Sequence, residues 1–326
     1  MCFCAYMSAL RLAALIFIVE ASTMVVVERT EAGLVISANK QVSQLARMAY
    51  RLRSFFGHLS ELWAYRELLR NLTVRDLKVR YRNSALGVLW SLGNPILMML
   101  VYTFVFTVMT GYSSREENYP VFVLCGILPW NFFSASVIGA IRSIVDNAPL
   151  VGKVYFPRET LPISVTLANL VNFLLALLVL FGLMAVSGIP FTRWILLLPA
   201  VIAVQVIFIV GFSLIMATAN VFYRDTQVIM EVVMMAWFFM TPILYPISIL
   251  PEEYYFAWLG ITINVERWMN ILNPMASIIA TYRVILYSGA PPDPYFFIRT
   301  LLTALGMLGV GALIFYHYSR RFAEEV

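Results

Sequence analysis

Long stretches without a charged residue limit most strongly how this chain can fold. From residue 83 onward, six intervals of roughly twenty residues or more lack Asp, Glu, Lys and Arg. These intervals are 83–114, 118–141, 160–192, 194–223, 232–251 and 300–319. About twenty apolar residues span a bilayer as a helix, and backbone groups in lipid must satisfy their own hydrogen bonds. The pattern predicts an all-α integral membrane protein with six transmembrane helices.

Composition supports the membrane class and argues against an enzyme. Of the 326 residues, 61% are hydrophobic and 13% are charged, whereas a soluble domain carries about 25% charged residues. The chain has no G-x-x-x-x-G-K-[ST] phosphate loop, no H-E-x-x-H zinc motif and no G-x-S-x-G nucleophile turn. Its three cysteines are too few and too scattered for a disulfide framework. The chain therefore has no visible means of using ATP or of cutting bonds, and a partner would have to supply energy.

Basic residues predict the orientation of the spans. With six spans, both chain ends lie on one side, and cytoplasmic segments are enriched in Lys and Arg. From residue 58 onward, twelve basic residues fall on the side of the ends and five on the other. Both termini, the segment around Lys153 and the Tyr223-Arg224-Asp225 turn are thus predicted to be cytoplasmic.

The chain divides into three predicted parts. Residues 1–57 fit poorly with the rest and are interpreted as a poorly ordered extension, with a signal peptide or a seventh span as alternatives. Residues 58–84 contain a basic amphipathic stretch, Glu61 to Arg82, which predicts a helix lying in the membrane interface. A cytoplasmic helix whose charges only set the topology is the alternative. Residues 85–326 form the six-span domain.

Several residues inside or beside the spans have structural interpretations. Pro95, Pro129, Pro242 and Pro246 predict kinks within spans. The run of Gly306, Gly309 and Gly311 predicts close helix packing.

The segment 247–294 is the least regular part of the chain. Its apolar runs, 254–265 and 268–282, are too short to span. They predict two external re-entrant helices, with Trp258 and Trp268 at the interfacial level.

A polar segment, 146–162, interrupts two long spans. Asp146 or Asn147 can cap a short helix, and Pro149 is acceptable in its first turn. We expect a helix over 150–156 whose Tyr155 and Phe156 rings face a groove of a soluble partner. The alternative is a turn whose basic residues touch lipid headgroups.

Motifs along the chain resemble the ABC-2 family of polysaccharide-export permeases, the membrane subunits that export O-antigen, capsule or teichoic acid chains. They cover residues 60 to 326. The matching stretches are Arg75-Asp76-Leu77-Lys78-Val79-Arg80-Tyr81-Arg82, Leu86-Gly87-x-x-Trp90, Asn94-Pro95, Leu150-Val151-x-Lys153-Val154-Tyr155-Phe156-Pro157-Arg158-Glu159-x-x-Pro162, Tyr223-Arg224-Asp225, Thr241-Pro242-Ile243-Leu244-Tyr245-Pro246 and Leu272-Asn273-Pro274-Met275.

The resemblance implies a homodimer in the cytoplasmic (inner) membrane, paired with separate ATPase subunits that use ATP and Mg²⁺. This chain itself would hold no cofactor or metal. In the family, the stretch matching 61–82 is the interface helix and the loop matching 147–159 is the coupling helix. The implied coupling residues are Leu150, Val151, Lys153, Val154, Tyr155, Phe156, Pro157, Arg158 and Glu159. Pro149 and Gly152 depart from the family pattern at the start of this helix.

The resemblance further implies a lipid-linked glycan as cargo. Its diphosphate would meet basic residues at the mouth of the first span, because Arg pairs with phosphate oxygens bidentately. The candidates are Arg75, Arg80, Tyr81 and Arg82, with topology-setting charge as the equal alternative. Candidate channel aromatics are Tyr102, Phe106, Trp237 and Phe238. An ABC-2 exporter of small hydrophobic drugs or lipids, a membrane-embedded glycan-modifying enzyme and a structural scaffold are the competing interpretations.

Overall fold

The fold was obtained as a computed structural model, which describes residues 63–82, 89–105, 118–247, 254–256, 261–264, 269 and 271–325. The predicted extension 1–57 lies outside these residues, as do Phe106, Trp258 and Trp268. The elements are α3 (Arg66–Tyr81), α4 (Leu89–Phe104), α5 (Tyr119–Arg142), α6 (Ala148–Lys153), α7 (Thr160–Val186), η3 (Arg193–Leu197), α8 (Leu198–Phe222), α9 (Thr226–Met240), β1 (Tyr254–Phe256), β2 (Ile261–Ile263), α11 (Pro274–Leu286), α12 (Pro294–Ser319) and α13 (Phe322–Glu325).

Long apolar helices dominate the structure, as the uncharged intervals predict. Among the described residues, α5, α7, the continuous η3–α8 segment and α12 are long and apolar enough to cross a membrane. The helical membrane class is therefore confirmed. Helices α4 and α9, in the first and fifth predicted spans, are 16 and 15 residues long and apolar.

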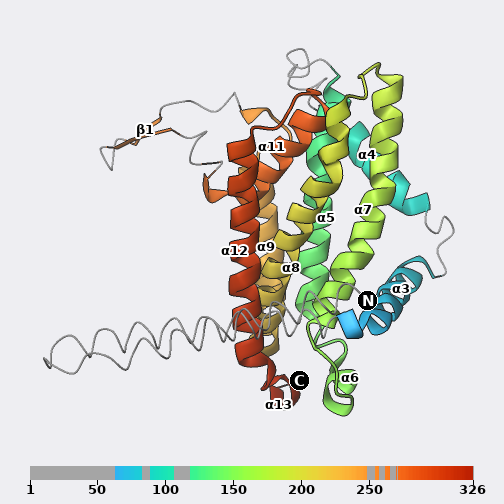
Figure 1. The fold of residues 1–326 in the computed structure, drawn as a ribbon, viewed down its shortest axis with the longest axis vertical. Helices are drawn as coiled ribbons and strands as arrows, with labels where there is room; N and C mark the ends of the chain where they lie inside the picture. The colour runs from blue at the N-terminus through green and yellow to red at the C-terminus, as the bar shows by residue number, and fades with distance from the viewer. Residues whose placement is uncertain are drawn as a thin grey trace, which may run out of the picture. The chain divides into compact units, whose positions relative to one another are not determined.

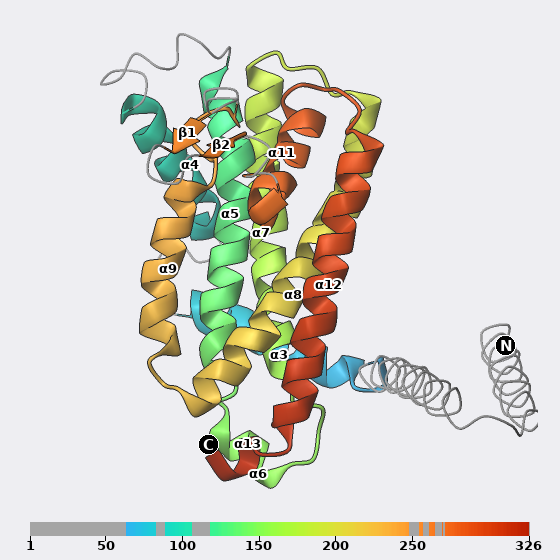
Figure 2. The same ribbon diagram turned by 90° about the vertical axis from the view of Figure 1, so that its left-hand side faces the viewer.

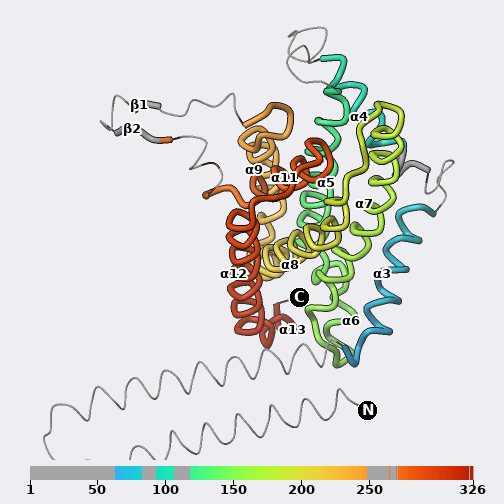
Figure 3. The backbone as a smooth tube through the Cα atoms, turned by 45° about the horizontal axis from the view of Figure 1, so that its top comes forward, coloured from blue at the N-terminus to red at the C-terminus, as the bar shows by residue number. Residues whose placement is uncertain are grey.

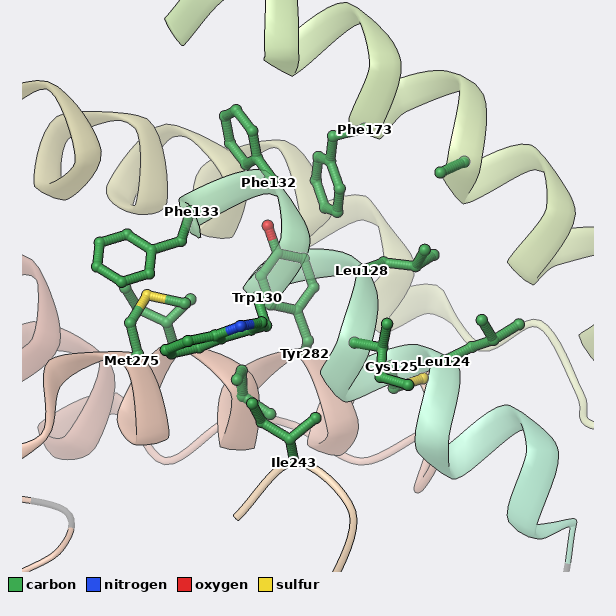
Figure 4. Close-up of a cluster of buried hydrophobic side chains, with 14 of the residues drawn as sticks. Leu124, Cys125, Leu128, Trp130, Phe132, Phe133, Phe173, Ile243, Met275 and Tyr282 are labelled. Atoms are coloured by element: carbon green, nitrogen blue, oxygen red, sulfur yellow. The ribbon is translucent and has the colours of Figure 1, made fainter. Parts of the chain in front are cut away.

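Helix α5 forms the centre of the bundle (Figure 1). It is buried along most of its length and contacts α4, α7, α8, α9 and α11. Figure 4 shows its Phe132 beside Phe173 of α7, and its Trp130 near Met275 and Tyr282 of α11. Gln205 of α8 donates to the Pro129 carbonyl over 2.8 Å, and the Tyr282 hydroxyl donates to Gln205 over 2.8 Å. These buried bonds hold α5, α8 and α11 together around Pro129, where the sequence predicts a kink.

The fifth predicted span is displaced along the chain. We expected helix over 232–251, but α9 begins at Thr226 and ends at Met240. Thr241 is extended (φ −100°, ψ 135°), because the ring of Pro242 disfavours a helical conformation in the residue before it. Pro242 and Pro246 therefore lie beyond this helix instead of kinking it.

A buried arginine holds the chain that follows α9. Arg283 of α11 is 9% exposed and donates to the carbonyls of Pro242 (2.6 Å) and Ile243. Its guanidinium carbon lies 3.7 Å from the Phe122 ring centroid of α5. Nearby, burial raises the pKa of the Tyr245 phenol, and the Arg283 charge opposes part of that shift.

The region predicted to be external differs from the prediction of two re-entrant helices. Residues 254–256 and 261–263 form a two-stranded antiparallel sheet, β1–β2, in which Tyr255 pairs with Thr262. These segments are rich in aromatic and β-branched residues, which favour strands. The helical prediction for this part of 254–265 was therefore wrong. Downstream, α11 starts after Asn273, whose side chain accepts from the Ala276 N–H, and α11 is largely buried.

Elements predicted to face the cytoplasm gather at one end of the bundle. Figure 2 shows α6, α13 and the turn between α8 and α9 at the same end, with α3 crossing the long helices nearby. Viewed from another direction, α3 lies along the start of α7 (Figure 3), and these two helices are in contact. The arrangement places the loop between α5 and α7 next to both α3 and the end of α12.

Candidate functional site

The α5–α7 loop, residues 143–159, contains the predicted coupling residues. Its short helix, α6, begins after Asn147 with Pro149 in the first turn, as its sequence predicts. The helix ends at Lys153 because Val154 is extended (φ −125°, ψ 135°), so the expected helix over 150–156 is three residues too long at its end. The Val154 N–H still bonds to the Leu150 carbonyl and closes the last turn.

The loop presents one side chain almost completely and buries its neighbour. Tyr155 is 89% exposed and Val154 is 53% exposed, and Gly152 and Lys153 are also exposed. Phe156, in contrast, is only 6% exposed. It belongs to a cluster with Leu161 of α7, Phe315 of α12 and Phe322 of α13. The expectation that Phe156 faces a partner was wrong, because its ring is buried within this cluster.

Val151 is the second coupling candidate that points inward. It is 4% exposed and packs in the same cluster as Phe156, whereas Leu150 is half-buried at the edge of that cluster. Leu150, Val151, Val154 and Tyr155 are therefore divided between the interior and the surface. Val154 and Tyr155 lie beyond the end of α6, where the helical spacing no longer applies.

Arg158 and Glu159 join the loop to α12. Arg158 Nη1 donates to the Ser319 carbonyl, and the Tyr316 hydroxyl donates to Glu159 Oε1 over 3.1 Å. Glu159 is 5% exposed, and Pro157 is buried beside it. These bonds link residues about 160 positions apart in the chain, so no local pattern in the sequence predicts them.

The predicted headgroup residues lie on α3 and face two other elements. Arg75 Nη1 donates to Asn147 Oδ1 over 2.9 Å and also pairs with Asp76. Arg80 Nη1 donates to Asn169 Oδ1 of α7 over 2.8 Å, and the Tyr81 hydroxyl donates to Asn172 Oδ1. Arg82 follows the helix end and is exposed. Thus α3 is bonded both to the beginning of α6 and to α7.

Two cavities adjoin these residues. A cavity of about 550 Å³ is lined by Arg75, Arg80, Ser143, Asp146 and Asn147, among others. A second cavity, of about 380 Å³, is lined by Arg80, Tyr81 and amide side chains of α4, α5 and α7. The sequence analysis did not single out these amides, Asn94, Asn131, Asn169 and Asn172. The sequence could have identified them, because they are polar residues in otherwise apolar helices. Polar groups within membrane helices are costly and often mark functional sites.

The candidate channel aromatics divide between packing and a third cavity. Trp237 packs against Phe133 and Phe212, with ring centroids 5.2 and 5.7 Å away, and its Nε1 donates to Asn273 Oδ1 over 3.0 Å. Tyr102 and Phe238, with centroids 6.2 Å apart, line a cavity of about 400 Å³ between α4, α5 and α9. Phe106 lies outside the described residues.

Comparison with known proteins places the chain in a transporter family. Residues 67–287 match the ABC-2 type transporter family. The chain is 38% identical over 270 residues to the O-antigen export system permease protein RfbA of Myxococcus xanthus, covering 82% of this chain and 98% of the relative. It is 34% identical over 278 residues to the protein of the same name from Klebsiella pneumoniae, covering 85% and 99%.

A more distant relative points the same way. The chain is 23% identical over 207 residues to the polysialic acid transport protein KpsM of Escherichia coli, covering 62% of this chain and 80% of the relative. The long apolar helices, the α5–α7 loop with its exposed tip and the nearly full-length similarity agree, and this chain belongs to the ABC-2 transporter family.

Proposed function

We propose that this chain is the permease subunit of an ATP-driven exporter that moves a lipid-linked polysaccharide across the cytoplasmic membrane. The observation that carries the proposal is the similarity over 98% of the length of an O-antigen export permease, at 38% identity. A second relative is named for transport of polysialic acid, which is also a polysaccharide. O-antigen, capsule and teichoic acid chains are the candidate cargo class.

The working assembly in this proposal contains two copies of the permease and two separate ATPase subunits. Each permease has six spans, with α4 and α9 counted as the first and fifth, and both termini in the cytoplasm. The twelve-to-five distribution of basic residues supports this orientation. The ATP and Mg²⁺ are used by the partner subunit.

The α5–α7 loop is the proposed contact with the ATPase. Tyr155 offers an almost fully exposed aromatic ring, the type of side chain that dominates binding energy at protein interfaces. Lys153 and Val154 flank it at the tip. Leu150, Val151, Phe156, Pro157, Arg158 and Glu159 then serve as the base that holds this tip in place, rather than as the contact surface.

The contacts of the loop suggest which helices move when the ATPase displaces the loop. Glu159 and Arg158 lead directly into α7 and are bonded to α12. Asn147, at the start of α6, is bonded to Arg75 of α3. A displacement of the loop therefore acts on α3, α7 and α12 together, and we propose that their tilting opens a path between the two permease subunits.

The cargo headgroup meets the protein at α3 in this proposal. Arg75, Arg80 and Arg82 supply guanidinium groups for the diphosphate, and Tyr81 supplies a hydroxyl. The 550 Å³ cavity beside Arg75 and Arg80 is the space available for it.

The test is Tyr155→Ala in the permease co-expressed with its ATPase. We expect glycan-stimulated ATP hydrolysis and export to fall about tenfold or more, because truncation of an interface anchor costs on the order of 2 kcal/mol or more. Tyr295→Ala is the matched control. Tyr295 is also highly exposed (79%), but it lies at the start of α12, and the α5–α7 loop is bonded to the other end of that helix. Normal export by Tyr155→Ala would contradict the docking role, and failure of glycans to stimulate the wild-type complex would contradict the cargo.

A further inference from the structure

Four asparagines from three helices line one cavity. Asn94 of α4, Asn131 of α5, and Asn169 and Asn172 of α7 all border the 380 Å³ cavity. All four lie in apolar helices, α5 and α7 being long enough to cross the membrane. A polar side chain within a membrane helix is costly, so several converging on one cavity indicate a bound polar ligand. The volume is within the range of about 300–1,000 Å³ found for ligand sites.

Two of these asparagines, Asn169 and Asn172, already form hydrogen bonds within the protein. Asn169 accepts from Arg80 and donates to the Val165 carbonyl over 3.0 Å, so both of its polar atoms are bonded. Asn172 accepts from Tyr81 through its oxygen, which leaves its NH₂ group available. Within the described parts of the chain, the side chains of Asn94 and Asn131 have no hydrogen-bond partner. These two amides and the Asn172 NH₂ can therefore bind both donors and acceptors of a ligand.

Two aromatic residues also line this cavity. They are Phe132 of α5 and Phe173 of α7, and their rings stack with centroids 5.0 Å apart and planes at 10° (Figure 4). Leu128 and Ala176 complete the apolar lining. A ring-shaped ligand rich in hydroxyl groups, such as a sugar, suits a site with a partly apolar lining and a few placed amides.

The positively charged side chain of Arg80 also lines the cavity. Arg80 lines both the amide cavity and the neighbouring 550 Å³ cavity. Its observed bond is to the neutral amide of Asn169, and no carboxylate in the described segments forms an ion pair with it. Its charge is therefore available to an anion, and guanidinium groups bind phosphate oxygens well. A sugar in the amide cavity would lie beside a phosphate at Arg80.

We propose that the cavity formed by Asn94, Asn131 and Asn172 binds the first sugar ring of the lipid-linked cargo, while Arg80 binds the adjoining diphosphate. The inference rests on the proposed function and extends it, because it assigns sugar recognition to the permease, at a site separate from the diphosphate. The permease would then select its cargo by the ring nearest the lipid.

The experiment compares two probes on the purified full-length permease in lipid nanodiscs. One probe is a long-chain alkyl diphosphate that carries one hexose, and the other is the same diphosphate without sugar. For the wild type, we expect tighter binding of the sugar-bearing probe. Asn131→Leu should weaken binding of that probe about tenfold and leave the sugar-free probe unchanged, because the variant removes only amide hydrogen bonds to the ring.

Two further variants separate this inference from the proposed function. Arg80→Gln should weaken the binding of both probes, because it removes the charge that binds the diphosphate. Gln227→Leu, which removes an amide of α9 that borders none of the three cavities, should bind both probes as the wild type does. If Asn131→Leu lowers the melting temperature, Asn94→Leu on α4 serves in its place.

The outcomes are distinct. Equal binding of the two probes by the wild type, or an unchanged preference in Asn131→Leu and Asn94→Leu, would overturn the sugar site while the diphosphate role of Arg80 stands. If neither probe binds to the wild type, both the sugar site and the headgroup role are overturned.

Discussion

Gly311 of α12 lies against Gly211 of α8, where the two helices pack closely. A β-carbon on Gly311 would overlap the Gly211 carbonyl oxygen, and one on Gly211 would come within 2.5 Å of the Leu308 nitrogen. Gly306 and Gly309 were predicted to pack in the same way, but a β-carbon at either would meet nothing within 4 Å. Only one of these three α12 glycines packs against α8, because only one face of α12 touches it.

Gly311→Val should destabilise the protein. The added side chain forces α8 and α12 apart, and overpacking of this kind costs about 1–3 kcal/mol or more. The measurement is the melting temperature of the purified protein in detergent. Gly309→Val, two positions away, is the control and should melt close to the wild type. Equal melting of both variants would contradict the close α8–α12 contact.

Single residues also show what local reasoning misses. In the sequence, Arg283 is one of five basic residues on the outer side, but in the structure it is buried among the carbonyls after α9. Phe156 looks like an exposed anchor in its polar segment, yet it is buried in a cluster with residues of α7, α12 and α13. Both outcomes depend on segments far away in the chain, which no local pattern reveals.

Among the elements, α12 and the α5–α7 loop form the pairing with the clearest functional consequence. The bond from Tyr316 to the buried Glu159 and the bond from Arg158 to the Ser319 carbonyl attach the last long helix to the loop. Phe156 is buried in the same apolar cluster as Phe315 and Phe322. A loop held in this way can transmit force as a rigid element.

Tyr316→Phe should loosen the loop while leaving the helices in place. Leaving a buried hydrogen-bonding group without its partner costs about 1–3 kcal/mol, so we expect amide hydrogen exchange over 154–160 to accelerate about tenfold. Tyr318→Phe is the matched control, because the Tyr318 ring packs against Phe222 and its hydroxyl has no partner among the described residues. Unchanged exchange in Tyr316→Phe would show that this bond does not hold the loop.

Element boundaries were predicted well where composition decides them and poorly where turns do. The predicted span 118–141 matches α5 to within one residue at each end, and α7 begins with the predicted span 160–192 and ends six residues before it, because apolar length is a property of the segment alone. Helix α9 was predicted to run through Pro242, although the restriction that this proline imposes on Thr241 is local and could have been recognised.

At the scale of the whole molecule, the bundle has two chemically different ends. One end carries α6, α13 and the α8–α9 turn, and the other carries η3 and the start of α12 (Figure 2). The basic residues are concentrated at the first end, which supports a cytoplasmic assignment for it.

Cysteine labelling tests this orientation. In a chain whose native cysteines are replaced, Lys153→Cys should react only with a reagent that reaches the cytoplasmic face, because both Lys153 and the loop tip are exposed there. Asp293→Cys, at the start of α12 and also exposed, should react from the outer face. Labelling of Lys153→Cys from outside would reverse the topology and remove the proposed contact with a cytoplasmic ATPase.

The sequence by itself determined the membrane class, the positions of the long helices and the family motifs, because apolar length and local residue order are carried by each segment alone. Only the tertiary structure decided that Tyr155 is exposed while Phe156 is buried, that Arg283 lies inside, and that four asparagines from three helices share one cavity. Those features depend on which distant helices meet, and burial, hydrogen bonding and cavity shape exist only once they have packed.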